Sequence, residues 1–165
     1  MRLRGCFAPL NPEQQKRKGW ASMATAADAG LILQLYELRQ EETLRKARKF
    51  LTFDFDPKDV DELRAVSRAR GTEENAYWRQ AMSYWEMAAS LVLRGALDGD
   101  LFLDSNAEGL LIYAKYHHFH KDTEQQNGPF MRNTAALIAK YPSARQRYEF
   151  MLKNLEARRQ EAAKG

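Results

Sequence analysis

Cysteine, proline, glycine and long apolar runs are all scarce in this chain, and each shortage excludes a class of protein. Cys6 is the only cysteine among 165 residues, so no internal disulfide can form and no Cys-x-x-Cys pair exists for zinc or redox chemistry. Nine Gly and five Pro are few for the many turns of a β-sandwich or barrel. The best apolar run, residues 87–97, is shorter than the ~20 residues that span a bilayer and is interrupted by Arg94.

The first ten residues also lack the features of an export signal. Arg2 and Arg4 are present, but no adequate hydrophobic stretch precedes Pro9, so a secretory signal peptide is not expected. A single cysteine fits a reducing compartment. Together these absences predict a cytoplasmic protein.

Excess positive charge is confined to the start of the chain. The net charge is +4, and residues 1–22 alone contain five basic residues and one acidic residue. The rest of the chain therefore holds 21 residues of each sign and is neutral. We interpret 1–22 as a disordered basic tail or a misassigned start, and 23–165 as the helical domain.

Helical periodicity dominates the remainder, and no stretch alternates as a strand does. The pattern predicts an all-α fold, a single-domain bundle of five to six helices. The strongest segment is 73–97, which is apolar nearly all round and therefore belongs at the centre. The other predicted helices cover approximately 25–51, 57–68, 106–121, 130–141 and 143–162.

Capping residues support these boundaries. Thr25 can cap the first helix, with Asp28 three residues on, where a carboxylate suits a helix N-terminus, and Thr72 can cap the central helix. Asp56 can cap a helix that has Pro57 in its first position. Residues 98–109 are interpreted as a turn at Asp98-Gly99, followed by a capping box formed by Ser105 and Glu108.

A charged face at 39–49 is the one region besides the tail that suggests nucleic-acid binding. Its bases alternate with acids, and Glu41–Arg45 and Glu42–Lys46 have the favourable i,i+4 order. Acids interleaved with bases repel phosphates. A solvent-facing helix surface is thus the favoured interpretation, with nucleic-acid binding through the tail and this face as an alternative.

Catalytic and cofactor motifs are missing. There is no glycine-rich phosphate loop, no Gly-x-Ser-x-Gly elbow and no His-Glu-x-x-His. Di-iron bundles need Glu-x-x-His, and none of the histidines has a glutamate three residues before it. The sequence therefore predicts no catalytic residue and no cofactor.

All three histidines lie within four positions, His117, His118 and His120. On a helix His117 and His120 share a face, while His118 points about 100° away. Lys115 and Lys121 flank the cluster. Histidines near a helix C-terminus interact well with its dipole, and this interpretation is favoured over a metal site, which stays open as a second alternative.

Glu86 is the other candidate binding residue. It lies midway along the apolar 73–97 helix, in a narrow polar seam with Arg79, Ser83, Ser90 and Arg94. A buried carboxylate needs a partner. We expect either a seam that faces water or a structural pair with Arg132 or Arg94, and ask whether Glu86 and a histidine share one cavity.

The segments 84–102, 110–119 and 141–155 resemble a family of bacterial all-helical domains of unknown function. In that family a Glu-bearing hydrophobic helix is followed by Gly and Asp at a turn, and the matching residues here are Glu86, Gly95 and Asp98. Many such proteins are tethered to a membrane by an N-terminal helix, which this chain lacks. The resemblance implies a helical fold and brings no activity with it.

Abundant aromatic residues without an assembled site favour a binding role. The function predicted is a non-enzymatic helical interaction or regulatory module, whose partner is another protein or a second copy of the chain.

Overall fold

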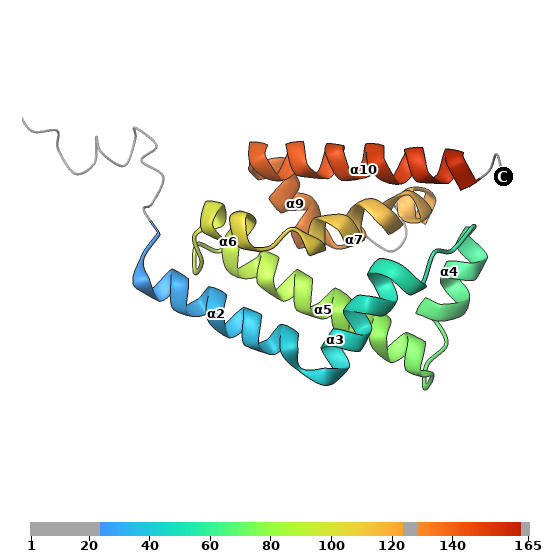
Figure 1. Cartoon of the computed structure of the whole chain (residues 1–165), viewed down its shortest axis with the longest axis horizontal. Coiled ribbons are helices and arrows are strands. Elements are labelled where there is room, and N and C mark those ends of the chain that lie inside the picture. Colours follow the sequence, from blue (N-terminus) through green and yellow to red (C-terminus); the bar gives the residue numbers. More distant parts are fainter. Residues whose placement is uncertain (1–23, 124–128, 163–165) are drawn as a thin grey trace, which may run out of the picture.

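Helices make up the regular structure of the computed structural model, which describes residues 24–123 and 129–162 (Figure 1). The all-α prediction is confirmed for these residues, which contain eight α-helices. They are α2 (Ala26–Gln40), α3 (Glu42–Lys49), α4 (Val60–Ser67), α5 (Glu73–Leu93), α6 (Gly99–Ser105), α7 (Glu108–Tyr116), α9 (Arg132–Lys140) and α10 (Pro142–Ala162). A π-helical turn η1 (Phe50–Asp54) and a 3₁₀ segment η2 (His117–Thr123) complete the set. The proposed tail, 1–22, lies outside the described residues.

The predicted number of five to six helices is too low because two boundaries were missed. The segment 25–51 divides at Glu41, whose extended backbone ends α2 while its carboxylate accepts the N–H groups of Thr43 and Leu44. Glu41 therefore caps α3 and does not pair with Arg45. The pair Glu42–Lys46 does form, at 2.8 Å.

The second missed boundary lies in 98–109, where a helix replaces the expected turn. Asp98 caps α6 by accepting the N–H of Leu101, and Phe102 and Leu103 are buried beneath it. The predicted Ser105–Glu108 capping box is wrong, because the Ser105 hydroxyl donates to the Leu101 carbonyl and no side chain caps α7.

The remaining caps are partly as expected. The Thr25 and Thr72 caps are confirmed, and Thr25 forms a full capping box with Asp28. Asp56 does not cap α4; the helix begins three residues after Pro57 and is capped by Asp59, which accepts two N–H groups. Before Pro57 the chain forms the π-helical turn η1.

Helix α5 occupies the centre, with α10 along one edge of the molecule and α2 with α3 along the opposite edge (Figure 1). It packs against α9, α3, α4, α6 and η1. Trp78 and Trp85 of α5 are buried, and the Trp78 ring meets Phe55, Tyr116 and Phe130. The aromatic stripe of α5 thus forms the core of the fold.

Helix α5 ends at Leu93, four residues before the predicted end, because Gly95 takes a left-handed conformation. The N–H groups of Gly95 and Ala96 donate to Val92 and Leu91, which closes the helix in a Schellman motif. Just beyond, Gly99 is buried against Tyr141, and an added Cβ would lie 2.3 Å from that ring. This contact lets α6 approach the junction of α9 and α10.

In the described part of the chain, every helix is too short or too polar to cross a bilayer.

Candidate functional site

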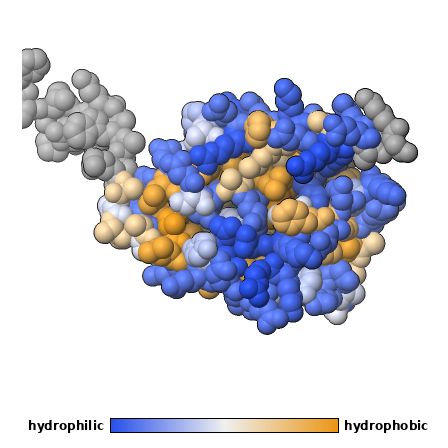
Figure 2. Space-filling view, viewed as in Figure 1, coloured by the Kyte–Doolittle hydropathy of each residue, from blue (hydrophilic) through white to orange (hydrophobic). Residues whose placement is uncertain are grey.

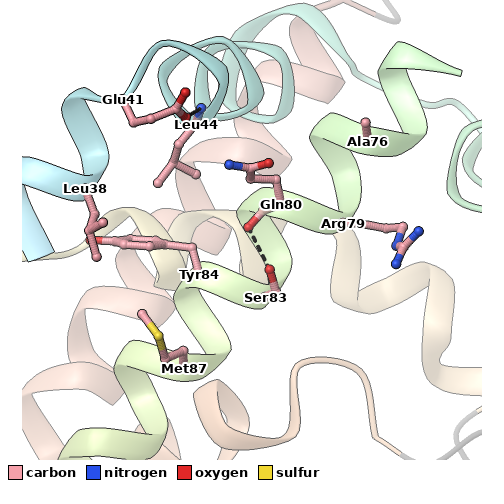
Figure 3. A pocket seen from close by; sticks show the side chains of 9 residues that line it. All are labelled: Leu38, Glu41, Leu44, Ala76, Arg79, Gln80, Ser83, Tyr84 and Met87. Carbon is pink, nitrogen blue, oxygen red and sulfur yellow. Dashed lines mark hydrogen bonds between the residues drawn. The ribbon is translucent and has the colours of Figure 1, made fainter.

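A groove of about 750 Å³ lies between the C-terminal end of α2, the start of α3 and the outer side of α5 (Figure 3). We call it the α2–α5 groove. Its apolar wall consists of Leu38, Leu44, Tyr84 and Met87. Leu38 is 51% exposed and Met87 44%, so two large apolar side chains face solvent here.

Three hydrogen bonds position α2 along this groove. Near its start, the Asp28 carboxylate accepts the N–H of Asp98 at 2.8 Å. In its middle, the buried Tyr84 hydroxyl donates to the Leu35 carbonyl at 2.7 Å. At its end, Arg39 donates to the Asn106 side chain at 2.9 Å. Helix α2 is thus held by polar contacts at three points.

A charged cluster secures the junction of α2 and α3 on α7. Arg48 donates to both oxygens of Glu108, at 2.8 and 2.5 Å, and Arg39 approaches the same carboxylate at 3.6 Å. All three side chains are mostly buried. Hydrogen bonding to Glu108 raises the pKa of the Arg48 guanidinium. The Arg39 guanidinium also lies over the Trp85 ring, which ties the cluster to α5.

Most bases of the 39–49 face therefore contact acids of this same chain. Arg39 and Arg48 turn inward to Glu108, Lys46 pairs with Glu42, and Lys49 pairs with Asp54 at 3.2 Å. Lys46 and Lys49 stay largely exposed beside their acids, and Arg45 is the remaining base of this face. The tail on which the nucleic-acid alternative also depends lies outside the described residues.

Apart from Arg79, the charged and hydroxyl groups of the groove are engaged in structural hydrogen bonds. Burial raises the pKa of Tyr84 to about 12, and the Tyr84 hydroxyl donates a hydrogen bond to the Leu35 carbonyl. Hydrogen bonds from the main chain of Thr43 and Leu44 lower the pKa of Glu41. The Ser83 hydroxyl donates to the Gln80 carbonyl (Figure 3). None of these groups is arranged to move a proton on a ligand near neutral pH.

Glu86 stands on a different side of α5 and acts as the cap of α9. Its carboxylate accepts the N–H groups of Asn133 and Thr134 and the Thr134 hydroxyl, all at 2.9 Å. Met131, at the N-cap position, is left-handed and makes no capping bond, so Glu86 replaces it from another helix. Among the described residues no ion pair joins Glu86 to Arg132 or Arg94. Of the polar seam of α5, Arg79 and Ser83 line the groove, whereas Glu86 faces α9.

The histidines are distributed over two surroundings. His117 stacks on Tyr113 and lines a small pocket of about 180 Å³ together with His118 and residues of α10. His120 stacks on Phe130, with ring centroids 4.1 Å apart. Glu86 does not meet them, because its carboxylate is directed at Asn133 and Thr134. Across residues 24–123 and 129–162, no three His, Cys, Asp or Glu side chains are grouped as a metal site requires.

Glu86, Gly95 and Asp98 turn out to share one kind of role. Glu86 caps α9, Gly95 ends α5, and Asp98 caps α6 while its N–H binds Asp28 of α2. Each residue defines a helix end, so the pattern that carried the family resemblance describes the architecture.

Sequence reasoning missed the groove residues. Leu38 was assigned to one apolar face of its helix together with Leu31 and Leu35, which suggested burial, and Met87 was considered only as the first residue of the apolar run 87–97. The signal that was present is the polar seam, since Arg79 and Ser83 share one side of α5 with Met87 and thereby indicate that this side is open.

Comparison with protein families gives one match: the model described as "Domain of unknown function (DUF4760)" covers residues 24–141. That range includes every residue of the α2–α5 groove and ends one residue before α10 begins. No curated protein and no solved structure matches the chain.

Proposed function

The chain belongs to the DUF4760 family, a domain of unknown function, and we propose that it is a binding module whose α2–α5 groove accepts an amphipathic helix of a protein partner. The observation that carries the proposal is the groove itself, about 750 Å³, with Leu38 and Met87 exposed on its wall. Apolar grooves between helices are a recurrent receptor for the apolar face of a helix.

The length of the groove supports a helical occupant. Its α5 wall extends from Ala76 to Met87, which at 1.5 Å per residue is about 16 Å or three helical turns. A docked helix of that length presents apolar side chains at i, i+4 and i+7. Leu38, Tyr84 and Met87 lie where such side chains would be buried.

The charge of the groove indicates the chemistry of the partner. Glu41 is engaged in capping α3, and Arg79 makes no hydrogen bond or ion pair within the described residues. Arg79 lies near the Ala76 end of the groove (Figure 3). We therefore expect the partner helix to carry an acidic residue at the end that docks beside Arg79.

The engaged polar groups favour binding over catalysis. Tyr84 keeps its proton, Glu41 is a helix cap and Ser83 is bonded within its own helix. A site that performs acid–base chemistry places at least one titratable group free to face the ligand.

Selection of helical peptides from a displayed library against the full chain tests this function. We expect selected peptides to share apolar spacing of i, i+4 and i+7 with one terminal acid. The variant Met87→Glu should weaken their binding by about tenfold or more, because a charge would be buried under the peptide. The control is Phe150→Glu on α10, an exposed apolar residue outside the groove.

Two results would contradict the proposal: a library that yields no enriched sequence, or peptides that bind wild type and Met87→Glu equally. Circular dichroism of both variants confirms that the exposed substitutions leave the fold intact.

A further inference from the structure

The outer face of α2 is apolar and uncovered, separately from the groove. Leu33 is 64% exposed and Tyr36 55% exposed, although both lie in the middle of a regular helix. The opposite face, centred on Leu35, packs against the body. Figure 2 shows apolar side chains gathered at this end of the molecule, over α2.

Small residues occupy the same face toward the start of α2. Ala26, Ala29 and Gly30 precede Leu33 by one to two turns and share its side of the helix. A Cβ added at Gly30 would meet no atom within 4 Å, so the space above it is open. The outer face of α2 therefore has small side chains in its N-terminal half and large side chains in its C-terminal half.

We propose that this outer face of α2 pairs with the same face of a second copy of the chain, antiparallel about a two-fold axis at Leu33. In that arrangement Leu33 meets Leu33 of the second copy. Residues displaced equally to either side of Leu33 face each other, so Tyr36 lies over Gly30, Glu37 over Ala29 and Gln40 over Ala26. Away from the axis, each large side chain of one helix meets a small residue of the other, as close helix packing requires.

Charge distinguishes a second copy from other occupants. The single basic residue of α2, Arg39, is turned inward onto Glu108 and Asn106. A helix that lies on an anionic lipid surface needs Lys or Arg beside its apolar face, and a nucleic acid needs the same. The outer face of α2 offers an acid, Glu37, in that place. Antiparallel helices also oppose their dipoles favourably.

The size of the face determines how strong the pairing can be. A fifteen-residue helix is about 22 Å long. Two such faces bury on the order of 800–1,000 Å², just below the ~1,200 Å² at the lower end of stable interfaces. We therefore expect a reversible dimer with a dissociation constant in the micromolar range, on the order of 10 μM.

The pairing leaves the α2–α5 groove accessible, because Leu38 lies on the inner flank of α2 and Leu33 on the outer face. The dimer would present two grooves, and its existence does not depend on the proposed function of the groove.

Sedimentation equilibrium of the full chain between about 1 and 300 μM tests the pairing. Wild type is expected to shift from monomer to dimer over this range. Leu33→Glu places two carboxylates face to face on the axis and should raise the dissociation constant at least ~30-fold. Phe150→Glu is the matched control, since Phe150 is 66% exposed on α10, and it should leave the constant within twofold. Met87→Glu should dimerise as wild type does. Failure of the proposed peptide binding in the groove can therefore be distinguished from failure of the proposed dimer.

Disulfide trapping tests the antiparallel register. In a Cys6→Ser background, Leu33→Cys should give a covalent dimer under mild oxidation, because the two thiols meet at the axis. Ala26→Cys should not, since antiparallel copies place these positions at opposite ends of the interface; a parallel pair would bring them together. A wild-type chain that remains monomeric at 300 μM, a Leu33→Glu variant that dimerises normally, or cross-linking at position 26 in place of 33 would each overturn the proposal.

Discussion

Helices α2 and α5 are both rich in apolar residues, but α5 lies at the centre of the fold and α2 at its edge. Both are apolar nearly all round, and both begin at a threonine cap. Yet eight residues of α5 are buried, and in α2 only Leu35 is buried. Helix α5 has neighbours on several sides, whereas α2 packs mainly on α3 and α6.

The difference lies in how each helix is attached. Helix α5 is held by buried aromatic residues: the Trp78 ring packs against Phe55, Tyr116 and Phe130, and the Trp85 ring packs against Tyr84. Helix α2 is held by three hydrogen bonds and by the charged cluster at its end, and its apolar outer face is uncovered. A similar composition thus supplies a core in one place and an exposed apolar face in the other.

The comparison is tested most strongly by truncating one large apolar residue in each helix. Trp85→Ala should lower the free energy of unfolding by about 3–5 kcal/mol, because a buried indole is replaced by a cavity. Leu33→Ala should change it by less than about 0.5 kcal/mol, because the side chain is exposed. Urea denaturation of both variants, at concentrations where the chain is monomeric, gives the two values.

A more conservative change sharpens the same test. Trp85→Phe removes an indole N–H that has no hydrogen-bond partner among the described residues, and it keeps an aromatic ring in the core. It should cost much less than Trp85→Ala. Equal losses for Trp85→Ala and Leu33→Ala would contradict the distinction between the two helices.

A smaller effect is expected at the charged cluster that attaches the α2–α3 junction to α7. Glu108→Ala leaves Arg39 and Arg48 mostly buried without their carboxylate, and should destabilise the fold by about 2–3 kcal/mol. A double-mutant cycle with Arg48→Ala isolates the pair, and its coupling energy should exceed about 1 kcal/mol. An exposed pair, Glu42 with Lys46, is the control and should couple by about 0.5 kcal/mol or less. Similar coupling in the two pairs would show that the cluster does not anchor α2 and α3.

Much of this fold follows from local pattern. The central α5 helix, its Thr72 cap and the break at Pro142 depend on periodicity and on the stereochemistry of single residues. The capping roles of Glu41 and Asp98 were harder to predict. Glu41 lies in a charged stretch that suggested an i,i+4 pair, and Asp98 lies in a stretch that suggested a turn, so neither pattern predicted the start of a helix. The helix α6 is short and depends on burial of Phe102 and Leu103 against distant elements, so local signals could not predict it.

The candidate sites depended still more on distant contacts. A glutamate in an apolar helix required a partner, and the partner was the start of α9, 47 residues away in the chain. Exposure of Leu33 and Tyr36 could not be predicted, because the period of α2 resembles that of a core helix. Only the positions of neighbouring helices decide which apolar face is covered.

The smallest expected effect concerns Tyr84, which links α5 to the middle of α2. Tyr84→Phe removes the hydrogen bond to the Leu35 carbonyl and should cost about 1 kcal/mol. Amide exchange should then accelerate in α2 and stay unchanged in the centre of α5, since only α2 loses an attachment. Acceleration of both helices together would mean that α2 is part of the same cooperative unit as the core.

The contribution of Tyr84 to stability can be measured separately at alkaline pH. Burial raises the pKa of Tyr84 to about 12, above the value of about 10 for a free phenol. The folded state therefore holds the proton more tightly than the unfolded state, and this contribution to stability is complete below pH 10 and is lost as the pH rises toward 12. Tyr84→Phe has no such proton to lose, so the stability advantage of wild type over the variant should shrink between pH 10 and 12. Urea titrations of both proteins at pH 8, 10 and 11 measure that difference, and titration common to both proteins cancels. A difference that stays constant with pH would place Tyr84 in contact with water and its link to α2 in doubt.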